Sequence, residues 1–338
     1  MIGPGVWMGL SHSVFLTEID GHERQAHRVP GSRGLVVIAG GVAVGLVAAL
    51  AAWTLVMACY TLLTGHGHEG MQGLDAAAKA MVDAHSGGLS INLLRLCLTT
   101  ATDAVFLLAF VALAALIGRH RLRTYITAAK SIRWRLLAVG LGLALIAVAP
   151  FVAADHLFGD GHGALPITDI SSDPLGRLTY GLASLLLVPA AAAEELFFRG
   201  WLLRQVNLFS RRPGVLVGVT ALVFAGLHFD FSPNGFLTLA LMGGGFAYMT
   251  LRLGGIEFAS GVHAANNILV VLFLQPLTGS RDAGGDTLSP TALIEDVALV
   301  GIYILLTEGV ARWPWLRRLA GLSETEISPS KVVAAHCG

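Results

Sequence analysis

The feature that most constrains this chain is a series of apolar segments long enough to cross a bilayer. A transmembrane helix needs about 20 mostly apolar residues, and charged residues are only 13% of the 338, about half the share usual in soluble domains. The bilayer is therefore the expected surrounding of most of the chain. Eight segments qualify as candidates, although 214–230 and 236–252 are short: 35–63, 91–117, 135–154, 178–203, 214–230, 236–252, 256–275 and 291–311.

The charges between these segments indicate how the chain is oriented. Lys and Arg are enriched in cytoplasmic loops, and basic connectors here alternate with acidic ones. The basic connectors are 118–134, 204–213 and the segment after 311, and the acidic ones are 64–90, 155–177 and 276–290. The alternation predicts an all-α, polytopic integral membrane protein with about eight transmembrane helices and both termini in the cytoplasm.

Smaller features of the sequence add little chemistry. The formal net charge is zero, so no overall positive field recruits nucleic acid. Three scattered cysteines show neither disulfide nor metal-site spacing, and the first 34 residues lack the apolar stretch of a signal peptide. The run His66-Gly67-His68-Glu69 is expected to be a solvated loop. Gly214-x-x-x-Gly218 and Gly243-Gly244-Gly245 are expected at helix–helix contacts.

Two adjacent glutamates in the fourth segment are the first candidates for chemistry. Glu194 and Glu195 lie within 178–203, where a charged side chain is costly and usually functional. On a helix, Glu195 and Arg199 are four residues apart with the acid first, the favoured arrangement for an ion pair. Glu194 points about 100° away, so it is expected to stay unpaired and to be available as a general base.

Polar side chains in two later segments complete the candidate site. A Phe-x-x-x-His run joins Phe224 to His228 in the fifth segment, and His263 and Asn267 share one helix face in the seventh, with Asn266 off that face. An imidazole is a base or donor near neutral pH, and an amide donates to an oxyanion without titrating. These groups are the ones needed to activate water and stabilise a tetrahedral oxyanion.

Each motif also has a purely structural interpretation. Intramembrane His and Asn often only join neighbouring helices, and the pair Glu195–Arg199 can simply stabilise packing. These motifs and Glu194 occur together on three separate apolar segments, which favours one common site. Phe229 and Asp230 are expected to help orient the ring of His228. Other charges are expected to pair or to reach the interface: Arg95, Asp103, Glu295, Asp296 and Glu308.

The segment boundaries place two of the candidates at different depths. Glu194 lies toward the predicted cytoplasmic end of 178–203, whereas His228 lies near the opposite end of 214–230. The two side chains meet only if the helices tilt strongly, if the fourth helix continues beyond its apolar segment, or if the fifth begins deep in the membrane.

The ordered motifs resemble those of the CPBP family (CAAX proteases and bacteriocin-processing enzymes, also called Abi), intramembrane peptidases that include the type II CAAX prenyl endopeptidases. The resemblance rests on Glu194-Glu195-x-x-x-Arg199, Phe224-x-x-x-His228 and His263-x-x-x-Asn267 and covers about 178–274. It implies a membrane peptidase in which Glu194 and His228 activate water and His263 and Asn267 hold the oxyanion. Glu195, Arg199 and Phe224 would support them. The implied division of the chain is 1–34 cytoplasmic tail, 35–177 N-terminal transmembrane helices with loops, 178–275 catalytic core, and 276–338 last transmembrane helix and cytoplasmic tail.

The same resemblance sets the expected cofactors and partners. No cofactor is expected, because the ligand set lacks an HExxH motif on one helix; if a metal binds, its ligands are Glu194, His228 and His263. The expected partners are the lipid bilayer and a peptide or lipidated protein, of prenylated CAAX type or bacteriocin-like, with no nucleic acid. The expected location is a bacterial cell membrane. The alternatives are a proton-coupled membrane transporter and a non-catalytic bacteriocin immunity or scaffold protein.

Overall fold

The protein is a bundle of α-helices of very different lengths. The computed structural model describes residues 15–16, 32–63, 88–158, 165–274 and 288–323. Residues 1–14 and 17–31 of the expected tail, the run His66 to Glu69 and the segment after Ser323 lie outside the described residues. The elements are α3 Ser32–Leu63, α5 Leu89–Gly118, α6 Leu122–Ile126, α7 Trp134–Phe158, α8 Pro166–Ile170, α9 Pro174–Ala183, η2 Ser184–Leu186, α10 Leu187–Glu195, η3 Leu196–Leu202, α11 Leu203–Phe209, α12 Pro213–Leu227, α13 Pro233–Leu253, α14 Glu257–Leu269, η4 Val270–Leu274, α15 Pro290–Arg312 and α16 Pro314–Ala320.

Six helices of the described part are long and apolar enough to cross a membrane, which confirms an all-α polytopic membrane protein. They are Gly34–Leu63, Leu89–Gly118, Trp134–Ala153, Pro174–Phe209, Pro233–Leu253 and Glu257–Leu274. The segment 236–252, expected to be short, lies in a helix of 21 residues. The segment 214–230 forms only the 15-residue α12, and α15 has the length of a span but carries Glu295, Asp296 and Glu308. The count of eight spans and the placement of both termini stay predictions.

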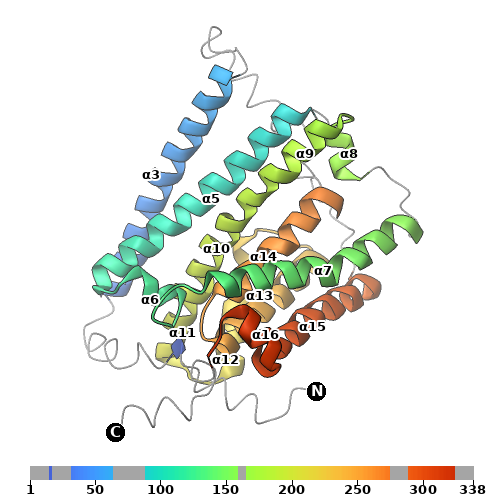
Figure 1. The fold of residues 1–338 in the computed structure, drawn as a ribbon. Helices are drawn as coiled ribbons and strands as arrows, with labels where there is room; N and C mark the ends of the chain where they lie inside the picture. The colour runs from blue at the N-terminus through green and yellow to red at the C-terminus, as the bar shows by residue number, and fades with distance from the viewer. Residues whose placement is uncertain (1–14, 17–31, 64–87, 159–164, 275–287, 324–338) are drawn as a thin grey trace.

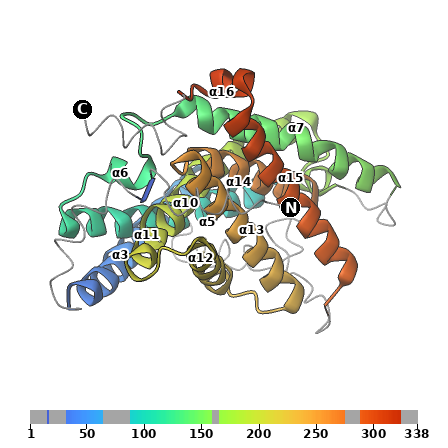
Figure 2. The ribbon, with the colours of Figure 1, turned by 90° about the horizontal axis from the view of Figure 1, so that it is seen from below.

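Two groups of helices cross each other in the bundle. α3, α5 and the helix that runs from α9 through α10 lie side by side, and α7 and α15 run across them in a different direction (Figure 1). Seen from below, α3 and α15 lie at opposite edges, with α10, α13 and α14 between them (Figure 2). α14 packs against both α7 and α10, and α13 packs against α12 and α15. The central helices therefore bring both groups together.

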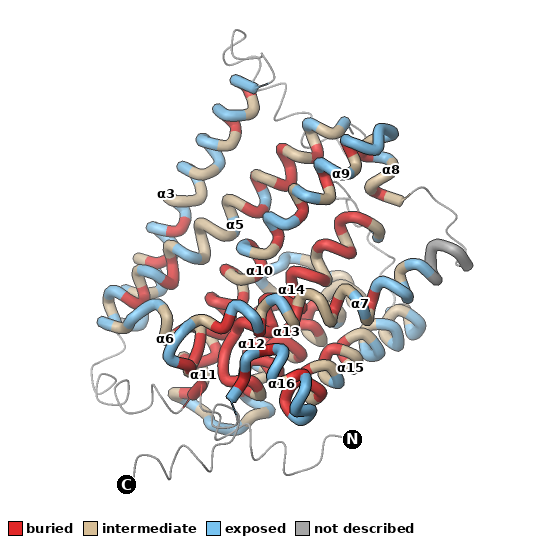
Figure 3. Tube along the Cα trace, in the orientation of Figure 1, coloured by how far each residue is buried: buried red, intermediate tan, exposed pale blue. Residues whose placement is uncertain are grey.

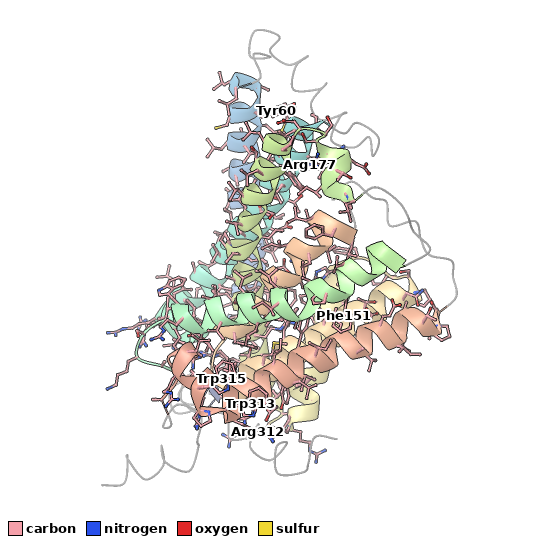
Figure 4. The ribbon with its side chains drawn as sticks, turned by 45° about the vertical axis from the view of Figure 1, so that its right-hand side comes forward. Tyr60, Phe151, Arg177, Arg312, Trp313 and Trp315 are labelled. Carbon is pink, nitrogen blue, oxygen red and sulfur yellow. The ribbon has the colours of Figure 1, made fainter. Side chains whose placement is uncertain are left out.

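Burial follows this arrangement. Buried residues concentrate on α10, η3, α13 and α14, whereas α3 exposes most of its length (Figure 3). The exposed side chains of α3 include Leu46, Val47 and Leu55, as expected for a helix whose outer face contacts lipid tails rather than water. The side chains at the two ends of the bundle also agree with a membrane surrounding. Tyr60 and Arg177 lie at one end, and Arg312, Trp313 and Trp315 lie at the other (Figure 4). Trp, Tyr and Arg are typical anchors at membrane interfaces.

Local sequence signals set where the helices begin and end. Six helices begin with proline, whose missing N–H is one of those left unsatisfied in the first turn. Asp173 caps α9 by accepting from Gly176 N at 2.9 Å, and Ser232 caps α13 by accepting from Gly235 N at 3.2 Å. Gly254 ends α13 with φ 72°, a left-handed conformation that favours glycine. The six initial prolines are Pro166, Pro174, Pro213, Pro233, Pro290 and Pro314.

The fourth candidate span is one 36-residue helix, Pro174–Phe209, with two changes of winding. A 3₁₀ turn at Ser184–Leu186 precedes Pro189, which has no N–H to offer the carbonyl of Leu185. A π-helical segment, η3, follows directly after Glu195, and such segments are frequent at functional sites. The backbone of Tyr125 comes so close here that a Cβ on Gly200 would lie 2.6 Å from its carbonyl oxygen.

The close helix–helix contacts lie at different glycines from those expected in the fifth segment. Gly214 and Gly218 have open space where a Cβ would project, so this pair does not form a helix contact with the described residues. Gly243 does: a Cβ there would lie 3.1 Å from Ala221 Cα on α12. The tightest approach joins α14 to α7, where a Cβ on Gly261 would lie 2.2 Å from the carbonyl oxygen of Leu137. A four-residue glycine spacing alone does not identify the packed face.

The basic connector before α7 is partly buried and tied to the start of α14. Thr127 and Gly255 form an isolated antiparallel bridge. Arg133, counted above as a loop charge, is buried and donates to both carboxylate oxygens of Glu257, at 2.9 Å and 2.7 Å. This bidentate geometry is the strong form of the Arg–carboxylate pair. Arg133 therefore fastens the connector to α14 rather than marking a solvated cytoplasmic loop.

Candidate active site

The depth conflict between Glu194 and His228 is resolved by the length of the fourth helix. Hydropathy ends the segment at 203, but the helix continues to Phe209. Glu194 therefore lies fifteen residues before Phe209, and His228 lies fifteen residues after Pro213, the start of α12. At 1.5 Å per residue, both are about 22 Å from the short connector between the two helices. The fourth helix does continue beyond its apolar segment, so the two side chains reach the same level.

The three candidate residues Glu194, His228 and His263 converge in space. Glu194 Oε2 lies 3.9 Å from Nε2 of His228 and 3.9 Å from Nε2 of His263. These separations are too long for direct hydrogen bonds. The side chain of Glu194 is 19% exposed, that of His228 33% and that of His263 5%. One carboxylate oxygen thus faces two imidazole nitrogens from two other helices, at the edge of the buried region.

Glu195 lies in a different environment from Glu194. Its Oε1 accepts from Arg199 Nη1 at 2.9 Å and from Nδ1 of His263 at 2.9 Å. Glu195 and Arg199 are both fully buried, and Arg199 Nη2 also donates to the carbonyl oxygen of Gly243 at 2.8 Å. The expected pair is present, and the structure adds His263 as a third member. The adjacent guanidinium of Arg199 compensates the negative charge of Glu195. This pairing makes Glu195 a poorer candidate for a base than Glu194.

Aromatic rings frame the buried charges. Phe224 packs at 4.4 Å from the ring of His228, and the Arg199 guanidinium lies over Phe224 at 4.5 Å, a cation–π distance. Phe246, on α13, stacks on His263 with ring centres 4.6 Å apart and lies 5.2 Å from the same guanidinium. Phe224 therefore contacts members of all three motifs. Phe246 is a residue that the sequence pattern did not identify, because an additional phenylalanine in an apolar helix carries no distinguishing signal.

The backbone fixes the tautomer of His228. Its Nδ1 lies 2.7 Å from the carbonyl oxygen of Phe224, and a carbonyl can only accept, so the proton is on Nδ1. In the neutral ring, Nε2 then has a lone pair facing Glu194. Asp230, expected to orient this ring, accepts from the backbone N–H and the hydroxyl of Ser232. The carbonyl of Phe224, one turn upstream, holds the His228 ring through Nδ1.

A second chain of hydrogen bonds reaches Asn267. Asn266 Nδ2 donates to Asn267 Oδ1 at 3.5 Å, and Asn266 Oδ1 accepts from the hydroxyl of Tyr303 at 3.2 Å. Asn267 lies one turn after His263 on α14, as the spacing predicts. With its oxygen facing Asn266, the Nδ2 group of Asn267 is its remaining donor. Tyr303, on α15, was not identified from the sequence.

Three of the other charges singled out in the sequence, Glu308, Asp296 and Arg95, take part in structural contacts. Glu308 accepts from Arg252 at 2.7 Å, from Arg312 at 2.6 Å and from the hydroxyl of Tyr248 at 2.6 Å, at the end of the bundle that carries Trp313. Asp296 accepts from Thr238, which joins α15 to α13. Arg95 donates to Asn92 one turn away on α5.

The three converging residues do not fit a zinc ion as they are placed. Bonds of 2.0–2.1 Å in a tetrahedral site put neighbouring ligand atoms about 3.4 Å apart, and the carboxylate oxygen here is 3.9 Å from each nitrogen. Within the described part of the chain, no group of three metal-ligating side chains is close enough to hold an ion. Metal independence of the protein stays a prediction.

The fold and the site together define an integral membrane protein with a polar site where three helices of its core meet. A family model described as "Type II CAAX prenyl endopeptidase Rce1-like" matches residues 176–269, which span α9 to α14 and hold all seven candidate residues. The match confirms the resemblance inferred from the motifs, and at the level of the family it indicates a CAAX-type intramembrane protease.

Comparison with curated proteins gives a more limited result. The uncharacterized protein YyaK of Bacillus subtilis (strain 168) is 37% identical over 103 residues, an alignment that covers 27% of this chain and 33% of the relative. The chain thus matches about a third of that protein's length. No solved structure matches the chain.

Proposed function

We propose that this protein is an intramembrane, glutamate-dependent endopeptidase that activates water with Glu194 and His228. The observation that carries the proposal is the pair of 3.9 Å separations from Glu194 Oε2 to the two Nε2 atoms. A water oxygen about 2.8 Å from each of two atoms fits a 3.9 Å gap between them. Such a water donates one proton to the Glu194 carboxylate and the other to the lone pair of His228, so its own lone pair is free to attack a carbonyl carbon.

Glu194 is the base and then the acid of the reaction. As the water oxygen bonds to the scissile carbon, Glu194 takes one water proton, and a tetrahedral oxyanion forms. Glu194 then gives the proton to the leaving nitrogen while the C–N bond breaks, which yields a carboxylic acid and an amine. The attack is direct and no acyl-enzyme forms, because the motifs contain no Ser or Cys.

His263 and Asn267 stabilise the oxyanion. His263 donates through Nδ1 to Glu195, so its Nε2 donates to an oxyanion only when the ring carries both protons. The proposed oxyanion role therefore assigns both ring protons to His263 in this step. Asn267 supplies the second donor through Nδ2. Removing one oxyanion-hole donor typically costs 10²–10³ in kcat.

The proposed substrate is a peptide presented at the membrane, and a prenylated CAAX-type C-terminus is the first to test. The probe is an internally quenched peptide that ends in a farnesylated cysteine and three further residues, added to purified protein in liposomes. The measured quantities are the rate of cleavage and the mass of the released tripeptide. The same peptide without the farnesyl group shows whether the lipid is recognised.

The deciding variant is Glu194→Gln, which keeps the shape of the side chain and removes the base. We expect its cleavage rate to fall by about 10²–10⁴, the usual contribution of a general base. The matched control is Asp296→Asn, which changes a carboxylate of the same bundle on α15, where it binds Thr238; its rate should equal that of the wild type. Normal cleavage by Glu194→Gln would overturn the proposal. Proton flux into vesicles without cleavage would favour the transporter instead.

A further inference from the structure

One residue outside the matched domain contacts the proposed oxyanion site through hydrogen bonds. Tyr303 lies on α15, beyond residues 176–269, and its side chain is fully buried. Its hydroxyl donates to Asn266 Oδ1 at 3.2 Å. A buried tyrosine hydroxyl needs a partner, and this one finds it on α14, at the residue directly before Asn267.

A second hydrogen bond joins Asn266 to Asn267, the proposed oxyanion donor. Asn266 donates through Nδ2 to Oδ1 of Asn267 at 3.5 Å. An asparagine amide rotates over a broad, roughly two-fold range about its last side-chain torsion, so its oxygen and nitrogen can exchange places unless a partner fixes them. Tyr303 favours this orientation of the Asn266 amide, because its buried hydroxyl proton needs an acceptor and Oδ1 supplies one, whereas turning the amide round would take that acceptor away. In this orientation Nδ2 of Asn266 donates to the oxygen of Asn267. The Nδ2 group of Asn267 then points away from Asn266 and remains available as a donor.

We propose that Tyr303 is a positioning residue that sets the orientation of the Asn267 amide through Asn266. The inference rests on the proposed function, because it assigns Asn267 Nδ2 to the oxyanion. Catalytic groups need to be held within about 0.5 Å of their productive position, and Asn267 is only partly buried, so packing alone leaves its amide free to turn. The role explains why a polar hydroxyl is buried on α15, a helix that otherwise packs on α13 and α7.

The test replaces the hydroxyl and keeps the ring. Tyr303→Phe and Asn266→Ala should each lower kcat for the farnesylated probe peptide by about threefold to tenfold, the rate equivalent of one lost hydrogen bond, with KM unchanged. The matched control is Tyr248→Phe, which removes another buried tyrosine hydroxyl of the bundle, one that donates to Glu308 at 2.6 Å. Its kcat should stay at the wild-type value, and the thermal midpoints of all variants should be compared.

A double-variant measurement separates positioning from general damage. If Tyr303 acts through Asn267, then adding Tyr303→Phe to Asn267→Ala should produce no further fall in kcat. Equal fractional falls in both backgrounds would overturn the inference, as would a wild-type kcat for Tyr303→Phe while Asn267→Ala alone is slow. An unchanged kcat for Asn267→Ala itself would refute the proposed oxyanion role and, with it, the role of Tyr303.

Discussion

Glutamine substitutions at Glu194 and Glu195 should have different effects, although the two residues are adjacent: one should mainly lower activity and the other should mainly lower stability. Glu195 is fully buried and accepts from Arg199 and His263, both at 2.9 Å. Glu194 is 19% exposed, with 3.9 Å between its carboxylate and the nearest imidazole nitrogens. We therefore expect Glu195→Gln to lower the stability of the protein and Glu194→Gln to lower only its activity.

The size of the stability effect follows from what Glu195→Gln leaves behind. Arg199 has no exposed surface, so without the carboxylate it is a buried cation whose remaining anchor is the carbonyl oxygen of Gly243. Removing one partner of a buried ion pair costs about 3–5 kcal/mol, and the lower end applies because glutamine still offers an oxygen. At about 2–4 °C per kcal/mol, a loss of about 3 kcal/mol lowers the thermal midpoint by about 6–12 °C. For Glu194→Gln, the expected change is about 1 kcal/mol or less.

The assay is a thermal unfolding curve of each purified variant in the same detergent, followed by the cleavage rate of the farnesylated probe below both midpoints. Glu195→Gln should unfold early, and its residual folded fraction should still cleave, more slowly because His263 has lost its charged acceptor. Glu194→Gln should unfold with the wild type and cleave at the background rate. Equal midpoints for the two variants would refute the assignment of separate structural and catalytic roles.

Three further predictions test the rest of the structure. Cleavage should continue at the wild-type rate in EDTA and in 1,10-phenanthroline, because no step of the proposed mechanism uses a metal; loss of activity that added zinc restores would contradict this. Arg133→Ala should lower the free energy of unfolding by about 3–5 kcal/mol, measured by thermal unfolding, because it leaves Glu257 buried without its bidentate partner. Gly261→Ala should cost about 1–3 kcal/mol or more, since its Cβ meets the backbone of α7, while Gly218→Ala, which meets nothing, should be neutral or stabilising by up to about 1 kcal/mol.

Hydropathy was sufficient to find the long helices and insufficient to find their ends. Six of the eight expected segments are helices both long and apolar enough to cross a membrane. The fourth segment ends at 203 by hydropathy, where the basic connector 204–213, which contains Arg204 and Asn207, begins. Both are buried, and the Arg204 guanidinium lies 4.2 Å from the ring of Phe15 and 5.2 Å from that of Tyr125. Apolar runs mark where lipid can surround a helix, whereas tertiary partners decide how far the helix continues.

The same limit applies to the site. Spacing identified Glu194, Glu195, Arg199, His228 and His263, because polar side chains inside apolar helices stand out from their surroundings, and the structure brings all five together. Their partners could not be found that way: Phe246 and the carbonyl of Gly243 look like any part of an apolar helix. Which residues complete a site across helices is a property of packing, and packing depends on contacts far apart in the sequence.

The double glutamate itself has a simple physical explanation in this arrangement. Successive residues of a helix point about 100° apart, so one helix presents two carboxylates to two different surroundings. The carboxylate of Glu195 is compensated by Arg199 and by His263 and holds the imidazole in place. The carboxylate of Glu194 has no partner within hydrogen-bonding distance in the described structure, which suits the proposed role of taking a proton. A single glutamate could not do both, since the compensation that makes a buried carboxylate tolerable also makes it a poor base. His263 connects the two, because its Nδ1 is bound to the first carboxylate and its Nε2 faces the second.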